Sequence, residues 1–226
     1  MFGIPKVMQW IERPSLPQLL MALGESWLTK TQDALISSSN VAWLLSGGST
    51  PRPFYEWLAN QDLPWDRIHI FLVDDRCVPP TDILSNQRMV QLAFQRCWLE
   101  GASFHGMLPN LENPDLNLVA VTKEYAKLQV MPYLCLLGMG LDGHTASLFP
   151  GDKSSELGFL MDSPDVLFTQ APSHPIQRIS VSLPVVQRAK QVYVLFSGED
   201  KKQVWQDAKA NQAPISLVQE SCSNLE

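Results

Sequence analysis

A tight turn of glycines around an aspartate and a histidine is the segment of this sequence best suited to chemistry. Residues 138–144 read Gly-Met-Gly-Leu-Asp-Gly-His and directly follow the apolar run 133–137. The turn would hold the His144 imidazole near the backbone, with the Asp142 carboxylate two residues before it. An imidazole exchanges protons near neutral pH, so it can take a proton from water and return it to a leaving oxygen. His144 is therefore the residue that we single out for proton transfer, although a lone histidine is more often structural and donates to a carbonyl.

Two further segments that begin where an apolar run stops could hold an anion. Residues 46–51 read Ser-Gly-Gly-Ser-Thr-Pro, and residues 198–201 form a Gly-x-x-Lys turn at the start of an expected helix. Glycines let the backbone approach an anion, and amide groups at a helix start face it. A lysine in a first helical turn opposes the helix dipole, and a bound phosphate would compensate for that. An ordinary strand-to-helix turn and a freely solvated Lys201 remain compatible with the same patterns.

Two carboxylates and a guanidinium follow the apolar run 68–73. Arg76 could grip a phosphate or carboxylate, while Asp74 and Asp75 could orient a base or bind sugar hydroxyls. Taken alone, the three residues fit a solvated loop with a local ion pair better than a binding site.

The glycine spacing at 138–143 also matches the dinucleotide fingerprint Gly-x-Gly-x-x-Gly. In a dinucleotide fold this turn opens a long helix, and an acidic residue ends the next strand. Here Pro150 and Gly151 interrupt the segment too early for such a helix, and no acidic residue stands at the usual interval. A nicotinamide cofactor is therefore disfavoured.

Short apolar strands that alternate with helices must position these segments. Such alternation predicts a mainly parallel sheet with helices on both faces. Ligands bind outside the carboxyl ends of parallel strands, so the polar segments should converge on one ligand. One domain spanning residues 1–226 is the simplest organisation. We expect strands at 41–45, 68–73, 133–137, 166–170, 179–183 and 191–196, helices at 15–37, 51–60, 85–99, 115–129 and 200–210, and a polar turn at 74–76.

Composition narrows the classes of partner and compartment. The net charge of −6, without any basic run, argues against nucleic-acid binding. The cysteines lack Cys-x-x-Cys and metal-ligand spacing, which is typical of a reducing compartment and of a chain without a bound metal. Residues 1–6 carry no signal-like apolar core, and no run is long enough to span a bilayer. We expect a cytoplasmic protein that binds no membrane; monomer and homodimer both remain open.

Taken in order, these motifs resemble the 6-phosphogluconolactonase family. The resemblance runs from about residue 20 to 215 and is most specific at 138–150, which read Gly-Met-Gly-Leu-Asp-Gly-His-Thr-Ala-Ser-Leu-Phe-Pro. It includes the turn at 46–51, Asp-Asp-Arg-Cys-Val-Pro at 74–79, Ser85-Asn86, Arg178 at the head of a strand, and Gly-x-x-Lys at 198–201.

The resemblance implies a three-layer α/β/α sandwich, Rossmann-like and shared with glucosamine-6-phosphate deaminases. It also implies hydrolysis of 6-phospho-D-glucono-1,5-lactone to 6-phosphogluconate in the oxidative pentose phosphate pathway, without metal or organic cofactor. By the same resemblance, His144 is the general base, and Asp142 and Asp74 shape the site. The implied phosphate or sugar ligands are Gly47, Gly48, Ser49, Thr50, Arg76, Arg178 and Lys201.

Two departures from the family pattern and two rival functions accompany this hypothesis. Asp75 stands where the family usually has glutamate, and residues 221–226 are expected to lack the family's last short strand. A phosphosugar deaminase or isomerase on the same fold would need an acid shortly after His144, and residues 145–149 supply none. A non-catalytic phosphosugar sensor would need the cleft but not His144, and such sensors usually carry a DNA-binding module.

Overall fold

Seven short strands form one parallel sheet in the computed structural model, which describes residues 7–108, 112–222 and 224–225. The strand order is β1-β10-β9-β6-β2-β3-β5. All residues of β2 and β6 are buried, as expected for strands covered on both faces. The strands are β1 (Val7–Met8), β2 (Val41–Leu45), β3 (Ile68–Leu72), β5 (Ser103–His105), β6 (Tyr133–Leu137), β9 (Gln191–Val194) and β10 (Asn224–Leu225).

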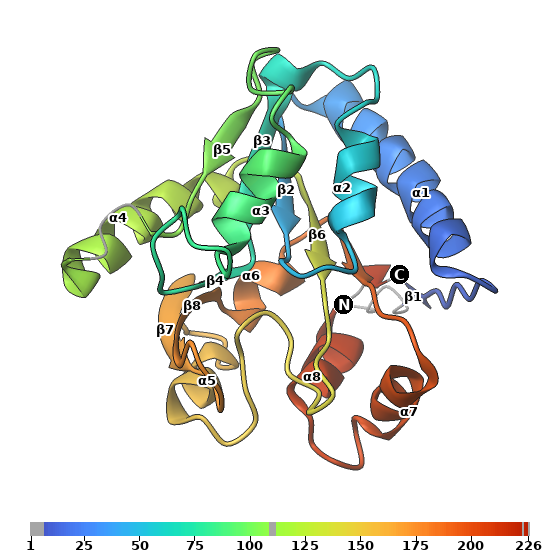
Figure 1. Cartoon of the computed structure of the whole chain (residues 1–226). Helices are drawn as coiled ribbons and strands as arrows, with labels where there is room; N and C mark the ends of the chain where they lie inside the picture. Colours follow the sequence, from blue (N-terminus) through green and yellow to red (C-terminus); the bar gives the residue numbers. More distant parts are fainter. Residues whose placement is uncertain (1–6, 109–111, 223, 226) are drawn as a thin grey trace, which may run out of the picture.

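Helices cover both faces of this sheet, which confirms the predicted three-layer α/β/α sandwich (Figure 1). The helices α1, α2 and α3 pack side by side, and α6 packs against α8. Among the described residues, no helix combines the length and apolar character needed to cross a bilayer. The helices are α1 (Leu16–Ser37), α2 (Arg52–Leu58), α3 (Asn86–Ala93), α4 (Pro114–Tyr125), α5 (Lys153–Gly158), α6 (Leu183–Gln187), α7 (Glu199–Asp207) and α8 (Pro214–Ser221), with 3-10 turns η1 (Trp65–Arg67) and η2 (Ala126–Gln129).

A second, antiparallel sheet corrects two expectations from the sequence. Its strands are β4 (Asp74–Arg76), β8 (Gln177–Val181) and β7 (Val166–Gln170), in that spatial order. The expected turn at 74–76 is a strand, because its backbone pairs with Arg178, Ile179 and Ser180. The expected parallel strands β7 and β8 form a hairpin instead. Their connection is far shorter than the dozen or so residues that a parallel crossover needs.

The chain also ends differently from the expectation. We expected residues 221–226 to lack the family's last strand, but β10 lies in the parallel sheet between β1 and β9. Leu225 pairs with Val192 of β9, and its carbonyl accepts a hydrogen bond from Gln9 N at 3.0 Å. A strand of two residues is too short to produce a hydrophobic period, so only its neighbours reveal it.

A histidine pair stands on β3 and β5, away from the polar segments. His69 Nδ1 lies 2.9 Å from His105 Nε2, and the other nitrogen of His105 contacts the Glu124 carboxylate. Burial lowers the pKa of both imidazoles below the ordinary value. These histidines therefore connect β3, β5 and Glu124 and lie outside the cleft described below.

The histidine pair should make the protein less stable in acid. The unfolded chain takes up protons at the ordinary pKa, whereas the folded imidazoles resist protonation, so the free energy of unfolding falls as pH drops from 7 to 5. Urea midpoints at several pH values measure this loss. His69→Gln should show a smaller loss than the wild type, and exposed His174→Gln should match the wild type. Equal losses in all three proteins would contradict the assignment.

Candidate active site

A cleft of about 580 Å³ is lined by the segments that follow β2 and β6, at the carboxyl edge of the parallel sheet. This volume is ordinary for a small-molecule site. The segments that the sequence predicted to converge do line it together, and Arg178 joins them from β8. The site residues implied by the family resemblance all line it: Gly47, Gly48, Ser49, Thr50, Asp74, Arg76, Asp142, His144, Arg178 and Lys201.

The histidine at the centre of the cleft is held by the preceding aspartate. Asp142 Oδ1 lies 2.5 Å from His144 Nδ1 and accepts a hydrogen bond from His144 N at 3.1 Å. Burial raises the pKa of Asp142, but the hydrogen bonds from His144 outweigh it and bring the pKa below its usual value. The carboxylate is therefore an acceptor, Nδ1 carries the proton, and Nε2 of a neutral His144 is left as the basic nitrogen.

Two glycines make this turn possible. A side-chain carbon on Gly140 would lie 2.2 Å from His144 Nδ1 and 2.4 Å from Asp142 Oδ1. Gly143 adopts φ +75°, a backbone conformation that other residues rarely adopt. The glycines thus serve the contact between Asp142 and His144 rather than a pyrophosphate.

Asp74 is buried in the cleft, where Ser147 and Asn86 form hydrogen bonds to it. Neither of these two residues was predicted as a site residue. Asp74 Oδ2 accepts a hydrogen bond from Ser147 Oγ at 2.5 Å, and Asn86 Nδ2 donates to its carbonyl oxygen at 2.9 Å. Ser147 follows Ala146, whose φ of +50° turns the backbone towards β8. Asn86 lies in the motif at 85–86 and Ser147 in the motif at 138–150, so these motifs could have identified both residues.

Asp75 does not reach the cleft, so its suggested contact with a base or sugar is wrong. Its carboxylate is fully buried and accepts from Asn86 N, Gln87 N and Arg76 N at 2.7, 2.9 and 2.7 Å, and from Ser85 Oγ at 3.1 Å. Burial raises the pKa of Asp75 to about 6, although the backbone amides oppose the shift. Asp75 therefore fastens the start of α3 to β4.

Two arginines occupy paired positions on adjacent strands of the second sheet, and both line the cleft. Arg76 pairs in register with Arg178. Arg76 Nη1 donates to Leu84 O and Asn86 Oδ1 at 2.7 and 2.9 Å, while its buried Nε lacks a partner among the described residues. Burial, followed by the charge of Arg76, lowers the pKa of Arg178. Like charges on opposed strand positions repel, so a bound anion would stabilise this wall.

The glycine turn after β2 approaches the same wall. A side-chain carbon on Gly47 would lie 1.8 Å from Asn86 Oδ1, and Gly48 adopts φ +100°. Lys201 extends to the cleft from the first turn of α7. Gly47 therefore has to be glycine because Asn86 lies against it.

Comparison with known proteins shows where this arrangement belongs. Residues 14–225 match the model of the family described as glucosamine-6-phosphate isomerases/6-phosphogluconolactonase. The chain belongs to this family. The family that the motifs predicted is therefore confirmed.

Individual members of the family agree with this assignment. A 6-phosphogluconolactonase from Synechocystis is 34% identical over 186 residues, which cover 77% of this chain and 73% of that protein. The rabbit GDH/6PGL endoplasmic bifunctional protein is 39% identical over 170 residues, and the match spans 71% of this chain but only 21% of the relative. A 6-phosphogluconolactonase structure from Shewanella baltica has the same fold, with a TM-score of 0.89 and 23% identity over 99% of this chain and 97% of that one.

The family includes sugar isomerases as well as lactonases. The acidic and metal-binding groups near His144 therefore bear on which of these reactions the cleft suits. Among residues 7–108, 112–222 and 224–225, no group of three or more His, Cys, Asp or Glu side chains is placed to hold a metal. Residues 145–149 contain no acid, and Phe149 packs against His144 with ring centroids 4.6 Å apart. The side of the imidazole that faces this segment therefore meets an aromatic ring rather than a carboxylate.

Proposed function

We propose that this chain hydrolyses 6-phospho-D-glucono-1,5-lactone to 6-phosphogluconate, with His144 as general base. The observation that carries the proposal is the 2.5 Å contact between Asp142 Oδ1 and His144 Nδ1, which leaves Nε2 as the base at the cleft. Curated relatives named 6-phosphogluconolactonase support the choice of substrate.

The reaction needs one proton to move twice. His144 Nε2 takes a proton from a water molecule as the water oxygen bonds to the lactone carbonyl carbon. The tetrahedral intermediate collapses, the bond from that carbon to the ring oxygen breaks, and protonated His144 returns the proton to the ring oxygen. The Asp142 carboxylate keeps the imidazole oriented and stabilises its charged form between the two transfers.

The phosphate of the substrate binds to the three cationic side chains that line the cleft. Arg76, Arg178 and Lys201 supply guanidinium and ammonium donors, and the anion relieves the repulsion between the opposed arginines. The glycine turn at 46–51 allows the sugar phosphate to approach the backbone. In this binding mode the lactone carbonyl lies near His144, and the phosphate lies at the other end of the substrate.

The lack of an acid at 145–149 favours the lactonase over an isomerase or deaminase on the same fold. The test is the loss of freshly generated 6-phosphogluconolactone, measured against its spontaneous hydrolysis. A rate well above background supports the proposal. A rate equal to background would overturn it and would favour a phosphosugar sensor.

We expect Lys201→Ala to weaken substrate binding more than it slows chemistry. Losing one charge-assisted hydrogen bond costs about 1.5–3 kcal/mol, which corresponds to a KM raised roughly 10- to 100-fold with kcat changed far less. Initial rates across a range of lactone concentrations separate the two constants. Exposed Lys30→Ala on α1 is the matched control and should keep the wild-type KM. An unchanged KM in Lys201→Ala would refute its role.

A further inference from the structure

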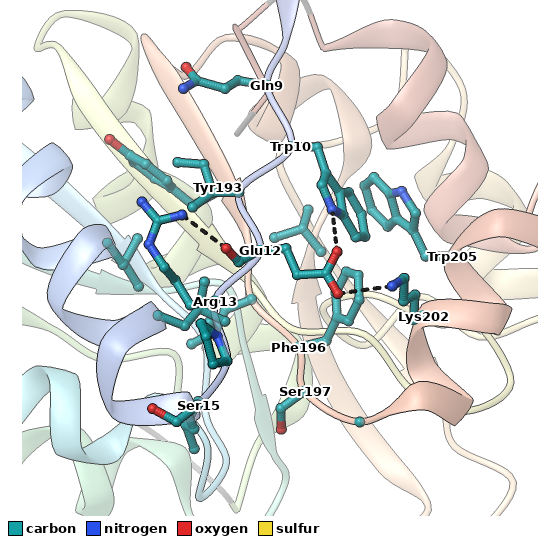
Figure 2. Close-up of a pocket in the computed structure, with 18 of the residues that line it drawn as sticks. Gln9, Trp10, Glu12, Arg13, Ser15, Tyr193, Phe196, Ser197, Lys202 and Trp205 are labelled. Carbon is teal, nitrogen blue, oxygen red and sulfur yellow. Dashed lines mark hydrogen bonds and ion pairs between the residues drawn. The ribbon is translucent and has the colours of Figure 1, made fainter.

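Residues 9–15, which we call the strap, join β1 to α1 and run past the carboxyl end of β9 beside α7 (Figure 2). The indole of Trp10 contacts Phe196 and Trp205, with ring centroids 5.8 and 6.1 Å apart. The Glu12 carboxylate accepts hydrogen bonds from Lys202 Nζ at 2.9 Å and from Trp10 Nε1 at 3.4 Å. The strap therefore contacts α7 through one aromatic side chain and one ion pair.

The first half of α7 is exposed or only partly buried. Trp205 is the only buried residue of this helix, and it also stacks on Phe196 at 5.5 Å. The helix starts at Gly198 without a side-chain cap, and Gln219 Nε2 of α8 donates to Trp205 O at 3.0 Å. That bond lies in the later part of α7, whereas the Glu12–Lys202 pair attaches the strap to its first turn.

The first turn of α7 is where the strap and the active site meet. Lys202 and Trp205 are three positions apart and share the helix face that the strap covers. Lys201 is one position earlier, so it points about 100° away around the helix and lines the catalytic cleft. Leu195, before the turn into α7, lines both the cleft and the cavity beneath the strap.

The strap does not pack continuously against the core. A cavity of about 280 Å³ lies between the strap and the core, walled by Leu19, Leu23, Tyr193 and Leu195. The strap itself stays anchored at both ends, because Gln9 N bonds to Leu225 O and Ser15 leads into α1. The strap thus links the edge of the parallel sheet to α7.

We propose that Trp10 and Glu12 are positioning residues that hold α7 so that the Lys201 ammonium faces the phosphate of the substrate. The proposal rests on the proposed function of the cleft. Trp10 provides most of the effect through its two ring contacts, because the Glu12 side of the ion pair is exposed and such pairs contribute little.

The test compares Trp10→Ala with Trp10→Phe and Glu12→Gln, assayed well below the melting temperature of each variant. We expect Trp10→Ala to raise KM about 3- to 10-fold with kcat within about twofold of wild type, since only binding depends on Lys201. Trp10→Phe should restore most of the wild-type KM, and Glu12→Gln should raise KM by less than Trp10→Ala. A fall in kcat at unchanged KM would overturn the proposal.

A double variant shows whether the strap works through Lys201. In the Lys201→Ala background, Trp10→Ala should change KM no further, because the group that it positions is already gone. The same fold-change in both backgrounds would overturn the proposal.

A readout independent of catalysis keeps this test separate from the proposed function. The rate at which an amine-acetylating reagent modifies Lys201, followed by peptide mass spectrometry with Lys30 as internal reference, should rise in Trp10→Ala as α7 loosens. If the wild type does not hydrolyse the lactone, the proposed function fails while this measurement still judges the strap. An unchanged modification rate would contradict the strap alone.

Discussion

His144→Ala is expected to lower kcat about 10²- to 10⁴-fold, the range in which a positioned general base contributes to catalysis. KM should change little, because the proposed phosphate ligands Arg76, Arg178 and Lys201 are unaltered in this variant. The side chain is about one-third exposed, so its truncation should leave the fold intact. The measurement is the initial rate of lactone loss after subtraction of the spontaneous rate.

Two companion variants sharpen that result. Exposed His174→Gln lies outside the lining of the cleft and should retain the wild-type kcat. Asp142→Asn should lower kcat less than His144→Ala, and the double variant should be no slower than His144→Ala alone, if Asp142 acts by orienting the imidazole. A separate rise in KM in Asp142→Asn would instead mean that this carboxylate binds the sugar directly. Equal rates for wild type and His144→Ala would end the proposed mechanism.

The second large effect is expected on stability, from Asp75→Ala. Removing the carboxylate leaves three backbone amides and the Ser85 hydroxyl without their acceptor inside the protein. An unsatisfied buried donor costs about 1–3 kcal/mol, so a total loss of about 3–5 kcal/mol is expected after partial relaxation. That corresponds to a Tm lower by roughly 6–20 °C in a domain of this size.

Thermal denaturation of matched variants at pH 7.5 checks this expectation. Exposed Asp62→Ala should keep the wild-type Tm. Asp75→Asn should fall between wild type and Asp75→Ala, because its amide retains one acceptor oxygen but turns a donor toward donors. A Tm of Asp75→Ala within about a degree of wild type would show that water replaces the carboxylate at α3.

Catalysis should fall with stability in Asp75→Ala for a structural reason. Asp75 anchors Asn86, and Asn86 in turn contacts both Asp74 and the guanidinium of Arg76. Displacement of Asn86 would therefore loosen both Asp74 and Arg76 in the wall of the cleft. Asp75 is thus important to the site although it does not touch the cleft.

The sequence by itself was sufficient for the parallel sheet and for the convergence of the site. The runs 41–45 and 133–137 are continuous apolar strands, which is the pattern of strands buried on both faces, and both occur as β2 and β6 with these bounds. Once those strands are parallel, their carboxyl ends share one edge, so the turns that contain Gly47 and His144 must meet. The motif at 138–150 was long enough to identify the family.

Tertiary structure alone decided which side chains of the second sheet face the ligand. Adjacent residues of a strand point to opposite sides, so one of Asp74 and Asp75 had to face away from the cleft. The residue pattern alone could not say which, because a segment of three polar residues has no hydrophobic period, and only the family resemblance pointed to Asp74. Pairing of β4 with β8 settles it: Asp74 lines the cleft, Asp75 enters the base of α3, and Arg76 meets Arg178. Burial and strand pairing depend on residues about a hundred positions apart, and no local pattern encodes them.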